Sequence, residues 1–351
     1  MQKNIRTISL KDLKEYFSSI GESSFRAKQV YEWLWKKSAR SFEEMSNLSK
    51  SLREKLKEDF LFEAVCISEK QISSDKTIKF AFKLPDEKIV EGVLIPTETR
   101  MTACVSAQVG CSLTCKFCAT GKLERLRNLE AFEMYDEVVL IKNEAEKLYK
   151  MPLTNIVFMG MGEPLLNYKN LIDAIEKITG EEGLNMASDR ITVSTAGITK
   201  MIKKLGDDNV KFNLAVSLHA SNDEKRNQIM PINESNNLKE LSSSLQYYFL
   251  KTGNPVTFEY IVFKDFNDSI KDANELAKFA KLVPSKINLI EYNSVEGEEF
   301  QNTSSDKLYN FKNHLETRGL IATIRRSRGK DIDAACGQLA NKAHPEAQIS
   351  E

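Results

Sequence analysis

The stretch CSLTCKFC at residues 111–118 carries three cysteines in a C-x3-C-x2-C spacing, directly after a strand-like run at 102–109. Three thiolates on one tight loop can point inward and hold three corners of an iron–sulfur cube. The loop has no fourth cysteine, because Cys104 lies upstream on the preceding strand. One iron of such a cluster would therefore stay open to an exchangeable ligand, as catalysis needs.

A zinc site is the alternative for these cysteines. Zinc usually takes four protein ligands in paired C-x2-C or C-x2-H units. The chain offers no second pair, and its only histidines are His219, His314 and His344. The ligand pattern therefore favours an iron–sulfur cluster held by Cys111, Cys115 and Cys118.

Around the cysteine loop, strand-like runs alternate with amphipathic helical patterns. The strand-like runs are 102–109, 155–160, 190–196, 212–219, 257–263 and 287–293, and a further run at 320–327 can join the sheet. Helical patterns include 170–178, 238–250, 272–283 and 306–316. Six βα units predict parallel strands joined by right-handed crossovers. Six are too few to close an eight-stranded barrel, so we expect an open, partial barrel of the α/β class, with ligands at the C-terminal ends of the strands.

The remaining chain divides by composition. Residues 1–65 read as a helical accessory domain, with amphipathic patterns at Arg26–Lys37 and Ser46–Phe60. Residues 66–100 alternate apolar and polar side chains and predict a short β-meander. The barrel then takes residues 101–328, and a polar tail, mobile in part, takes residues 329–351.

Composition limits the class of protein. The 351 residues are 41% hydrophobic and 28% charged, an ordinary globular profile, and 50 basic residues balance 50 acidic ones. No segment approaches the roughly 20 apolar residues that span a bilayer, and the N-terminus lacks a secretory pattern. We expect a cytoplasmic protein without a membrane partner, in which clustered cysteines bind metal rather than form a disulfide framework.

Other strand ends carry small and polar residues. MGMGEP at 159–164 resembles a dinucleotide-binding loop, but Leu165 stands where a third glycine would be. Small residues such as Gly162 at a strand end let the backbone approach a ligand closely, and a simple βα turn is the alternative. Polar groups at several strand ends of a barrel are typical of ligand contacts, although each alone is more often a cap or turn residue. They are Glu163, Ser194, Ser217, Leu218, His219 and Asn293.

The cysteine spacing, with Phe117 before the last cysteine, resembles the signature of the radical S-adenosylmethionine (SAM) superfamily. The resemblance implies a partial (β/α)6 barrel, one [4Fe–4S] cluster, and SAM bound at the open iron. It also implies that Gly162-Glu163-Pro164 contacts the SAM amino group and that the polar strand ends complete the SAM pocket. One-electron reduction then splits SAM and releases a 5′-deoxyadenosyl radical.

Five further stretches resemble the RlmN/Cfr family of RNA adenine methyltransferases: 104–121, MGMGEPLLN (159–167), SLHA (217–220), MPIN (230–233) and DIDAACGQL (331–339). The match covers nearly the whole chain. Pro164 and Leu165 resemble the RlmN branch, because the Cfr branch typically has alanine there. The resemblance implies methylation of C2 at adenosine 2503 of 23S rRNA and adenosine 37 of tRNAs, and the alternative is Cfr-like methylation of C8.

In this family two SAM molecules and a cysteine deliver the carbon, because C2 of adenine is electron-poor and cannot attack a methyl group. The resemblance assigns the methyl-accepting role to Cys336, and the role of resolving the covalent protein–RNA intermediate through a disulfide to Cys104. It assigns proton removal to Glu91, with Cys104 as a competing candidate. By its strand position Glu91 could equally lie on a solvated face. Cys66 has no counterpart in the family's motifs, and we expect it to be a core cysteine.

An RNA substrate needs local basic surfaces, since the net charge is zero. Two basic groups flank the expected site. One follows the cysteine loop and consists of Lys116, Lys122, Arg125 and Arg127, and the other precedes Cys336 and consists of Arg325, Arg326, Arg328 and Lys330. The N-terminal helices add a third group: Arg26, Lys28, Lys36, Lys37 and Arg40. We expect 23S rRNA and tRNA as partners, an external flavodoxin- or ferredoxin-like electron donor, and a monomer. A non-catalytic RNA-binding factor with structural zinc is the rival from another class.

Overall fold

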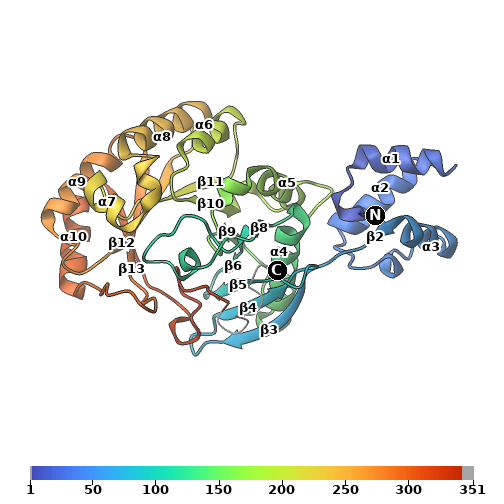
Figure 1. Cartoon of the computed structure of the whole chain (residues 1–351), viewed down its shortest axis with the longest axis horizontal. Coiled ribbons are helices and arrows are strands. Elements are labelled where there is room, and N and C mark those ends of the chain that lie inside the picture. Colours follow the sequence, from blue (N-terminus) through green and yellow to red (C-terminus); the bar gives the residue numbers. More distant parts are fainter. Residues whose placement is uncertain (1, 342–351) are drawn as a thin grey trace.

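The computed structural model describes residues 2–341 and centres on one ten-stranded sheet. Its strands follow the order β14-β13-β12-β11-β10-β9-β6-β5-β4-β3. Seven of them are mutually parallel: β6 (Met101–Cys104), β9 (Asn155–Phe158), β10 (Ile191–Thr195), β11 (Asn213–Ser217), β12 (Val256–Val262), β13 (Ser285–Glu291) and β14 (Ile321–Arg325). The sheet curves into an open barrel (Figure 1), as the six βα units and the terminal run predicted.

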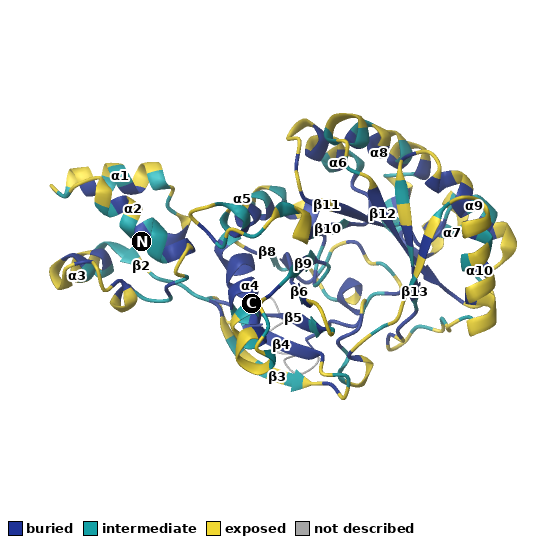
Figure 2. Ribbon diagram, turned by 180° about the vertical axis from the view of Figure 1, so that it is seen from behind, coloured by how far each residue is buried: buried dark blue, intermediate teal, exposed yellow. Residues whose placement is uncertain are grey.

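Helices cover the outer face of the parallel strands: α4 (Ala131–Tyr149), α5 (Tyr168–Thr179), α6 (Thr199–Asp207), α8 (Leu238–Thr252), α9 (Ile270–Ala280) and α10 (Ser305–Thr317). Helix α7 (Asp223–Ile229) instead packs at the ends of β10 and β11. The apolar stripe of α5 shows why: Leu171, Ala174, Ile175 and Ile178 recur at helical spacing and are all buried. Figure 2 shows this pattern as buried inner and exposed outer helix faces.

Alternation along the strands decides which side chains enter the barrel. On β12, Phe258 packs on Phe279 of α9, and Tyr260 packs on Phe311 of α10. Successive side chains of a strand point to opposite faces. Glu259 and Ile261 of the same strand therefore face the barrel interior.

The predicted meander extends this sheet. Strands β3 (Cys66–Ile72), β4 (Ile78–Lys83) and β5 (Ile89–Pro96) pair antiparallel, and β5 pairs antiparallel with β6. The prediction that Cys66 is a core residue is wrong, because its side chain is exposed. Cys66 stands opposite Lys83 at the start of the edge strand β3, and a β-bulge between Ile67 and Glu69 breaks the period of two beyond it.

The predicted strand 102–109 is interrupted. β6 ends at Cys104, and the chain bends through residues 105–107 before the two-residue strand β7 (Gln108–Val109), which pairs with β8 (Arg127–Asn128). The bend is fixed by backbone bonds from Ala107 N to Met161 O (2.9 Å) and from Gly160 N to Val105 O (3.0 Å). The cysteine loop therefore follows a β-ribbon above the sheet rather than the first barrel strand directly.

The N-terminal residues form a helical lobe beside the barrel (Figure 1). It contains α1 (Leu10–Ser19), α2 (Phe25–Trp35), α3 (Lys50–Asp59) and the short parallel pair β1 (Lys3–Asn4) and β2 (Phe60–Leu61). Helix α3 begins later than the predicted residue 46, because the Ser49 side chain caps it by accepting from Leu52 N.

A buried ion pair joins this lobe to the barrel. Arg6 Nη1 donates to both carboxylate oxygens of Asp136 on α4, at 2.6 and 2.7 Å, and the Arg6 guanidinium lies 4.9 Å from the Trp35 ring centroid. Asp136 also accepts from Val65 N at 3.0 Å. The lobe is thereby fixed to the first barrel helix.

The tail was expected to be mobile in part, but its described residues dock on the barrel. Asp331 accepts from the Ser73 hydroxyl and from Ser74 N, and Thr120 Oγ1 donates to Leu339 O at 2.6 Å. Residues 342–351 of the expected tail lie outside the described residues. No helix within residues 2–341 is long and apolar enough to cross a membrane.

Candidate active site

The cysteine loop lies over an apolar surface inside the barrel mouth. Cys111, Cys115 and Cys118 are partly buried and pack against a cluster that includes Phe117 and Phe263. The loop is tied by backbone bonds from Cys118 N to Cys115 O (3.2 Å) and from Lys116 N to Ile229 O at the end of α7 (3.1 Å). These contacts place three thiols on one short, enclosed segment.

The donor set is that of an iron–sulfur cluster: three cysteine thiols on one loop, each of which can bind a different iron. Burial raises the pKa of the Cys111 thiol to about 11 and raises those of Cys115 and Cys118 as well, so bound iron must displace their protons.

Gly162 provides the close approach that its sequence position suggested. Its φ is +91°, and a Cβ there would lie 2.4 Å from Gln108 Cβ. Gln108 Oε1 in turn accepts from Glu163 N at 2.8 Å. A side chain at position 162 would therefore separate the end of β9 from the ribbon that carries the cysteine loop.

Glu163 is buried and its carboxylate connects two strand ends. Oε1 accepts from Leu165 N at 3.1 Å, and Oε2 accepts from Ala196 N, just past β10, at 2.7 Å. Burial raises the Glu163 pKa to about 7, although the bond from Ala196 N opposes the shift. The Thr195 side chain also bonds this carboxylate, which leaves one of its four acceptor sites for a ligand amine.

The predicted residues of the next two strands lie side by side. Ser194 on β10 pairs in register with Ala215 of β11, and Ser217 ends β11. Both serines are half-buried, whereas Leu218 is fully buried and contributes its backbone. Leu218 N donates to Glu259 O at 3.0 Å, which fixes the turn that follows β11.

His219 is buried against the cysteine loop. Its ring lies 4.5 Å from the Phe117 ring in a T-shaped contact, and its Nδ1 accepts from Ile261 N at 3.1 Å. Burial, together with the charge of Arg226, lowers the His219 pKa to about 3. The imidazole is therefore neutral at physiological pH, with its proton on Nε2.

Asn293 connects the barrel to the tail. Its Nδ2 donates to the backbone oxygen of Cys336 at 3.1 Å. Asn293 is 5% exposed, and its Oδ1 is buried without a hydrogen-bond partner among the described residues. An unpartnered buried acceptor beside the predicted methyl-carrying cysteine fits a ligand that donates a hydrogen bond there.

The structure brings Cys336 close to both Cys104 and the cluster loop. The tail bonds to that loop through Ala119 N and Gly337 O (2.7 Å), one residue from Cys118 and from Cys336. Cys336 is accessible to solvent, yet protein surrounds its thiol densely enough to raise its pKa to about 11, and Cys118 contributes to this shift. Cys104 is buried, and burial followed by the charge of Cys336 raises its pKa to about 12.

Glu91 does not lie on a solvated face. It is 3% exposed, and its Oε2 accepts from the backbone N–H groups of Ala340 (2.8 Å) and Asn341 (3.1 Å) in the tail. Oε1 lies 3.4 Å from Lys79 Nζ. The carboxylate thus holds the segment that follows Cys336.

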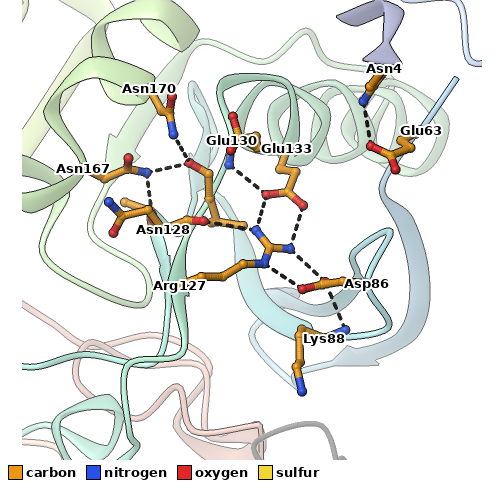
Figure 3. A network of polar contacts seen from close by, with 12 residues as sticks. Asn4, Glu63, Asp86, Lys88, Arg127, Asn128, Glu130, Glu133, Asn167 and Asn170 are labelled. Carbon is orange, nitrogen blue, oxygen red and sulfur yellow. Dashed lines mark hydrogen bonds and ion pairs between the residues drawn. The ribbon is translucent and has the colours of Figure 1, made fainter. Parts of the chain in front are cut away.

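Several predicted RNA-binding cations are engaged within the protein. Figure 3 shows Arg127 between Asp86 and Glu133, with bidentate bonds of 2.7–2.9 Å to both. Arg325 pairs with Glu259, Arg326 and Lys330 pair with Glu291, and Lys122 pairs with Glu298. Arg127 is therefore a structural residue, because its guanidinium fixes the ribbon to α4.

Sequence reasoning missed Arg226, which is fully buried on α7. Its Nη2 donates to Ala196 O (2.6 Å) and its Nε to Leu218 O (3.1 Å), while Nη1 donates to Asn233 Oδ1 (2.7 Å). Asn233 belongs to the MPIN stretch, so this stretch helps to hold the Arg226 guanidinium in place. The local pattern DEKRNQI reads as an exposed helix, so no signal in the sequence singled out Arg226.

Comparison with known proteins gives one family match for the N-terminal lobe and one for the barrel. A family model described as "Ribosomal RNA large subunit methyltransferase N-terminal domain" matches residues 3–61, and one described as "Radical SAM superfamily" matches residues 105–279. The crystal structure of a radical SAM methyltransferase from Sphaerobacter thermophilus is similar with a TM-score of 0.90 and 38% identity, over 96% of this chain and 99% of that one.

Close relatives span nearly the full length. A protein from Cytophaga hutchinsonii named "Probable dual-specificity RNA methyltransferase RlmN" is 63% identical over 341 residues, which cover 97% of this chain and 93% of the relative. A protein of the same name from Alkaliphilus oremlandii is 42% identical over 340 residues, with 97% and 98% coverage.

Proposed function

The chain belongs to the RlmN family of radical SAM methyltransferases, and we propose that it methylates C2 of adenosine 2503 in 23S rRNA and of adenosine 37 in tRNAs. The observation that carries this proposal is the meeting of three segments: the cysteine loop, Cys104 on β6 and Cys336 on the docked tail. An iron–sulfur cluster alone would need only the cysteine loop. The two further thiols are what carbon transfer to an electron-poor carbon requires.

Cys111, Cys115 and Cys118 would hold the [4Fe–4S] cluster, and the apolar surface around them would exclude water. Bound cluster and SAM supply the methyl group and the deoxyadenosyl radical. SAM would be bound by residues around the same barrel mouth: Glu163, Ser194, Ser217, Leu218, His219 and Asn293. Two observations support this assignment: Asn293 Oδ1 has no partner within residues 2–341, and the Glu163 carboxylate keeps one acceptor site.

Cys336 Sγ would carry the methyl group as S-methylcysteine. Accepting a methyl by displacement requires the thiolate, and the raised pKa means that the thiol is protonated before catalysis. Arg325 lowers the Cys336 pKa, against the larger effect of burial. Its guanidinium, which lies 3.3 Å from Glu259 inside the barrel, supports formation of the thiolate.

Cys104 would release the product. In the covalent intermediate a methylene carbon joins C2 of the base to Cys336 Sγ. Attack by the Cys104 thiolate on that sulfur forms an S–S bond and breaks the C–S bond, whose electron pair passes to the methylene carbon and takes up a proton. The Cys104–Cys336 disulfide must then be reduced by an external thiol before another turnover.

Glu91 would accept the proton from C2. Its burial and its position on β5, next to β6, support a place near Cys104. In the docked conformation of the tail, however, its oxygens already bind Lys79, Ala340 and Asn341. Proton removal by Glu91 would therefore require the tail to shift, and Cys104 stays the competing candidate for the base.

RNA would bind through those predicted cations that remain exposed and carry no ion pair among the described residues: Lys28, Lys36, Lys116, Arg125 and Arg328. The lobe of residues 1–65 would contribute the first two and act as an accessory RNA-binding domain. A cytoplasmic location, a monomeric state and a flavodoxin- or ferredoxin-like electron donor complete the proposal. We expect the affinity for RNA to fall steeply as salt increases.

Anaerobic reconstitution tests the proposal against the zinc-binding alternative. The protein should bind four irons, show a [4Fe–4S] spectrum and, after reduction with SAM, release 5′-deoxyadenosine. Stoichiometric zinc with no deoxyadenosine would contradict it. Salt-insensitive binding of the RNA substrate would contradict the assigned cations but leave the chemistry standing.

A further inference from the structure

Arg226 is a buried cation, and no carboxylate within residues 2–341 lies in hydrogen-bonding reach of it. All its hydrogen bonds go to neutral oxygens: Ala196 O, Ser217 O, Leu218 O and Asn233 Oδ1. Asp223, a carboxylate that acts on it through its charge, is exposed and accepts from Asn233 Nδ2 at 2.8 Å. Removing an unpaired cation from water is costly unless another charge compensates.

The cysteine loop lies next to this cation. Arg226 stands one turn before Ile229 on α7, and Ile229 O accepts from Lys116 N, the residue after Cys115. Ile229 is also buried in the apolar cluster against which Cys115 packs. A cluster on three thiolates would therefore add negative charge beside Arg226.

Close packing holds Arg226 in place. Gly197 follows β10 with a φ of +105°, and a Cβ there would lie 3.4 Å from Arg226 Nη2. The guanidinium binds the strand ends next to Ser194 and at Ser217, so it connects the predicted SAM contacts with the cysteine loop.

We propose that Arg226 is the counter-charge of the iron–sulfur cluster and raises its midpoint potential. The inference rests on the proposed function, since it presumes that Cys111, Cys115 and Cys118 hold the cluster. Reduction adds one electron to the cluster, and a fixed positive charge in a poorly solvated site stabilises the reduced form. Arg226 acts through the cluster and does not touch substrate, so it is a positioning residue.

A redox titration monitored by electron paramagnetic resonance tests this proposal without any measurement of methylation. Reconstituted wild type, Arg226→Met, Arg226→Lys and Asn233→Ala are reduced stepwise with dithionite in the absence of SAM. We expect a more negative midpoint potential for Arg226→Met and a return toward the wild-type value for Arg226→Lys. Asn233→Ala removes one hydrogen bond but keeps the charge, so its potential should match the wild type.

Two results would overturn the proposal. One is an unchanged potential in Arg226→Met at full iron content; the other is an equal shift in Asn233→Ala, which would mean that local structure sets the potential. If Arg226→Met loses its iron, Arg226→Gln retains a polar donor without the charge and should show the same negative shift. Loss of iron from both neutral variants but not from Arg226→Lys would support a role of the charge, and loss from all three would contradict it. A cluster in the wild type leaves the proposed function standing in every case.

Discussion

Glu91 Oε2 accepts a hydrogen bond from the backbone N–H of Ala340 at 2.8 Å, and thereby links β5 to the tail four residues beyond Cys336. The two residues are 249 positions apart in the chain. A candidate proton acceptor thus also fixes the position of the candidate methyl carrier.

Glu91→Gln should loosen the tail. The amide keeps one oxygen acceptor but loses the charge that strengthens bonds to Ala340 and Asn341. We expect faster hydrogen exchange at residues 337–341, measured by mass spectrometry, with Glu87→Gln as an exposed control on the neighbouring turn. Unchanged exchange in Glu91→Gln would show that other contacts, such as Asn341 Nδ2 with Ile89 O, suffice to hold the tail.

Cys104→Ala should trap the enzyme on its RNA. Without the resolving thiol, the bond between Cys336 and the base persists, and a covalent complex should appear by denaturing gel electrophoresis. Cys66→Ala is the matched control, because Cys66 is exposed at the start of β3. Release of free methylated RNA by Cys104→Ala at the wild-type rate would remove Cys104 from the resolving role.

Alkylation of Cys336 should depend steeply on pH. Burial raises its pKa to about 11, so its thiolate fraction should rise about tenfold per pH unit between pH 8 and 10 and level off above the pKa. Mass spectrometry of the apo protein after brief iodoacetamide treatment measures this, and modification of exposed Cys66 reports on the reagent. A plateau below pH 9 would mean that Arg325 outweighs burial.

Gly162→Ala should destabilise the protein more than Gly21→Ala. Both glycines have positive φ, which costs an alanine about 1–2 kcal/mol. At Gly21 the added methyl would meet no atom within 4 Å, whereas at Gly162 it would meet Gln108 at 2.4 Å, so the total cost at Gly162 should exceed about 3 kcal/mol. Denaturant unfolding checks the difference, and equal losses would mean that Gln108 moves freely.

The barrel could be predicted because its signals are local. Alternation and helical periodicity located the six strands and the terminal run within a few residues, and the cysteine spacing marked the loop. Alternation could not show that Cys66 is exposed, because a β-bulge between Ile67 and Glu69 breaks the period of two in β3.

Contacts between distant segments could not be predicted in this way. Alternation placed Glu91 on one face of a strand, but the tail that covers that face comes from the other end of the chain. Arg127 was predicted as an RNA-binding cation and Arg226 was not singled out, because the partners of both lie on other elements. Burial of a charge depends on tertiary packing and leaves no periodic trace in the sequence.

One isotope experiment tests the central claim, that a methyl group reaches adenine C2 through Cys336. The protein is first loaded with a trideuterated methyl group on Cys336, and then turned over once with unlabelled SAM and RNA, before nucleosides are analysed by mass spectrometry. We predict 2-methyladenosine that carries two deuterium atoms, because one is abstracted before transfer, and no product from Cys336→Ala. Undeuterated 2-methyladenosine, or 8-methyladenosine in its place, would contradict the claim.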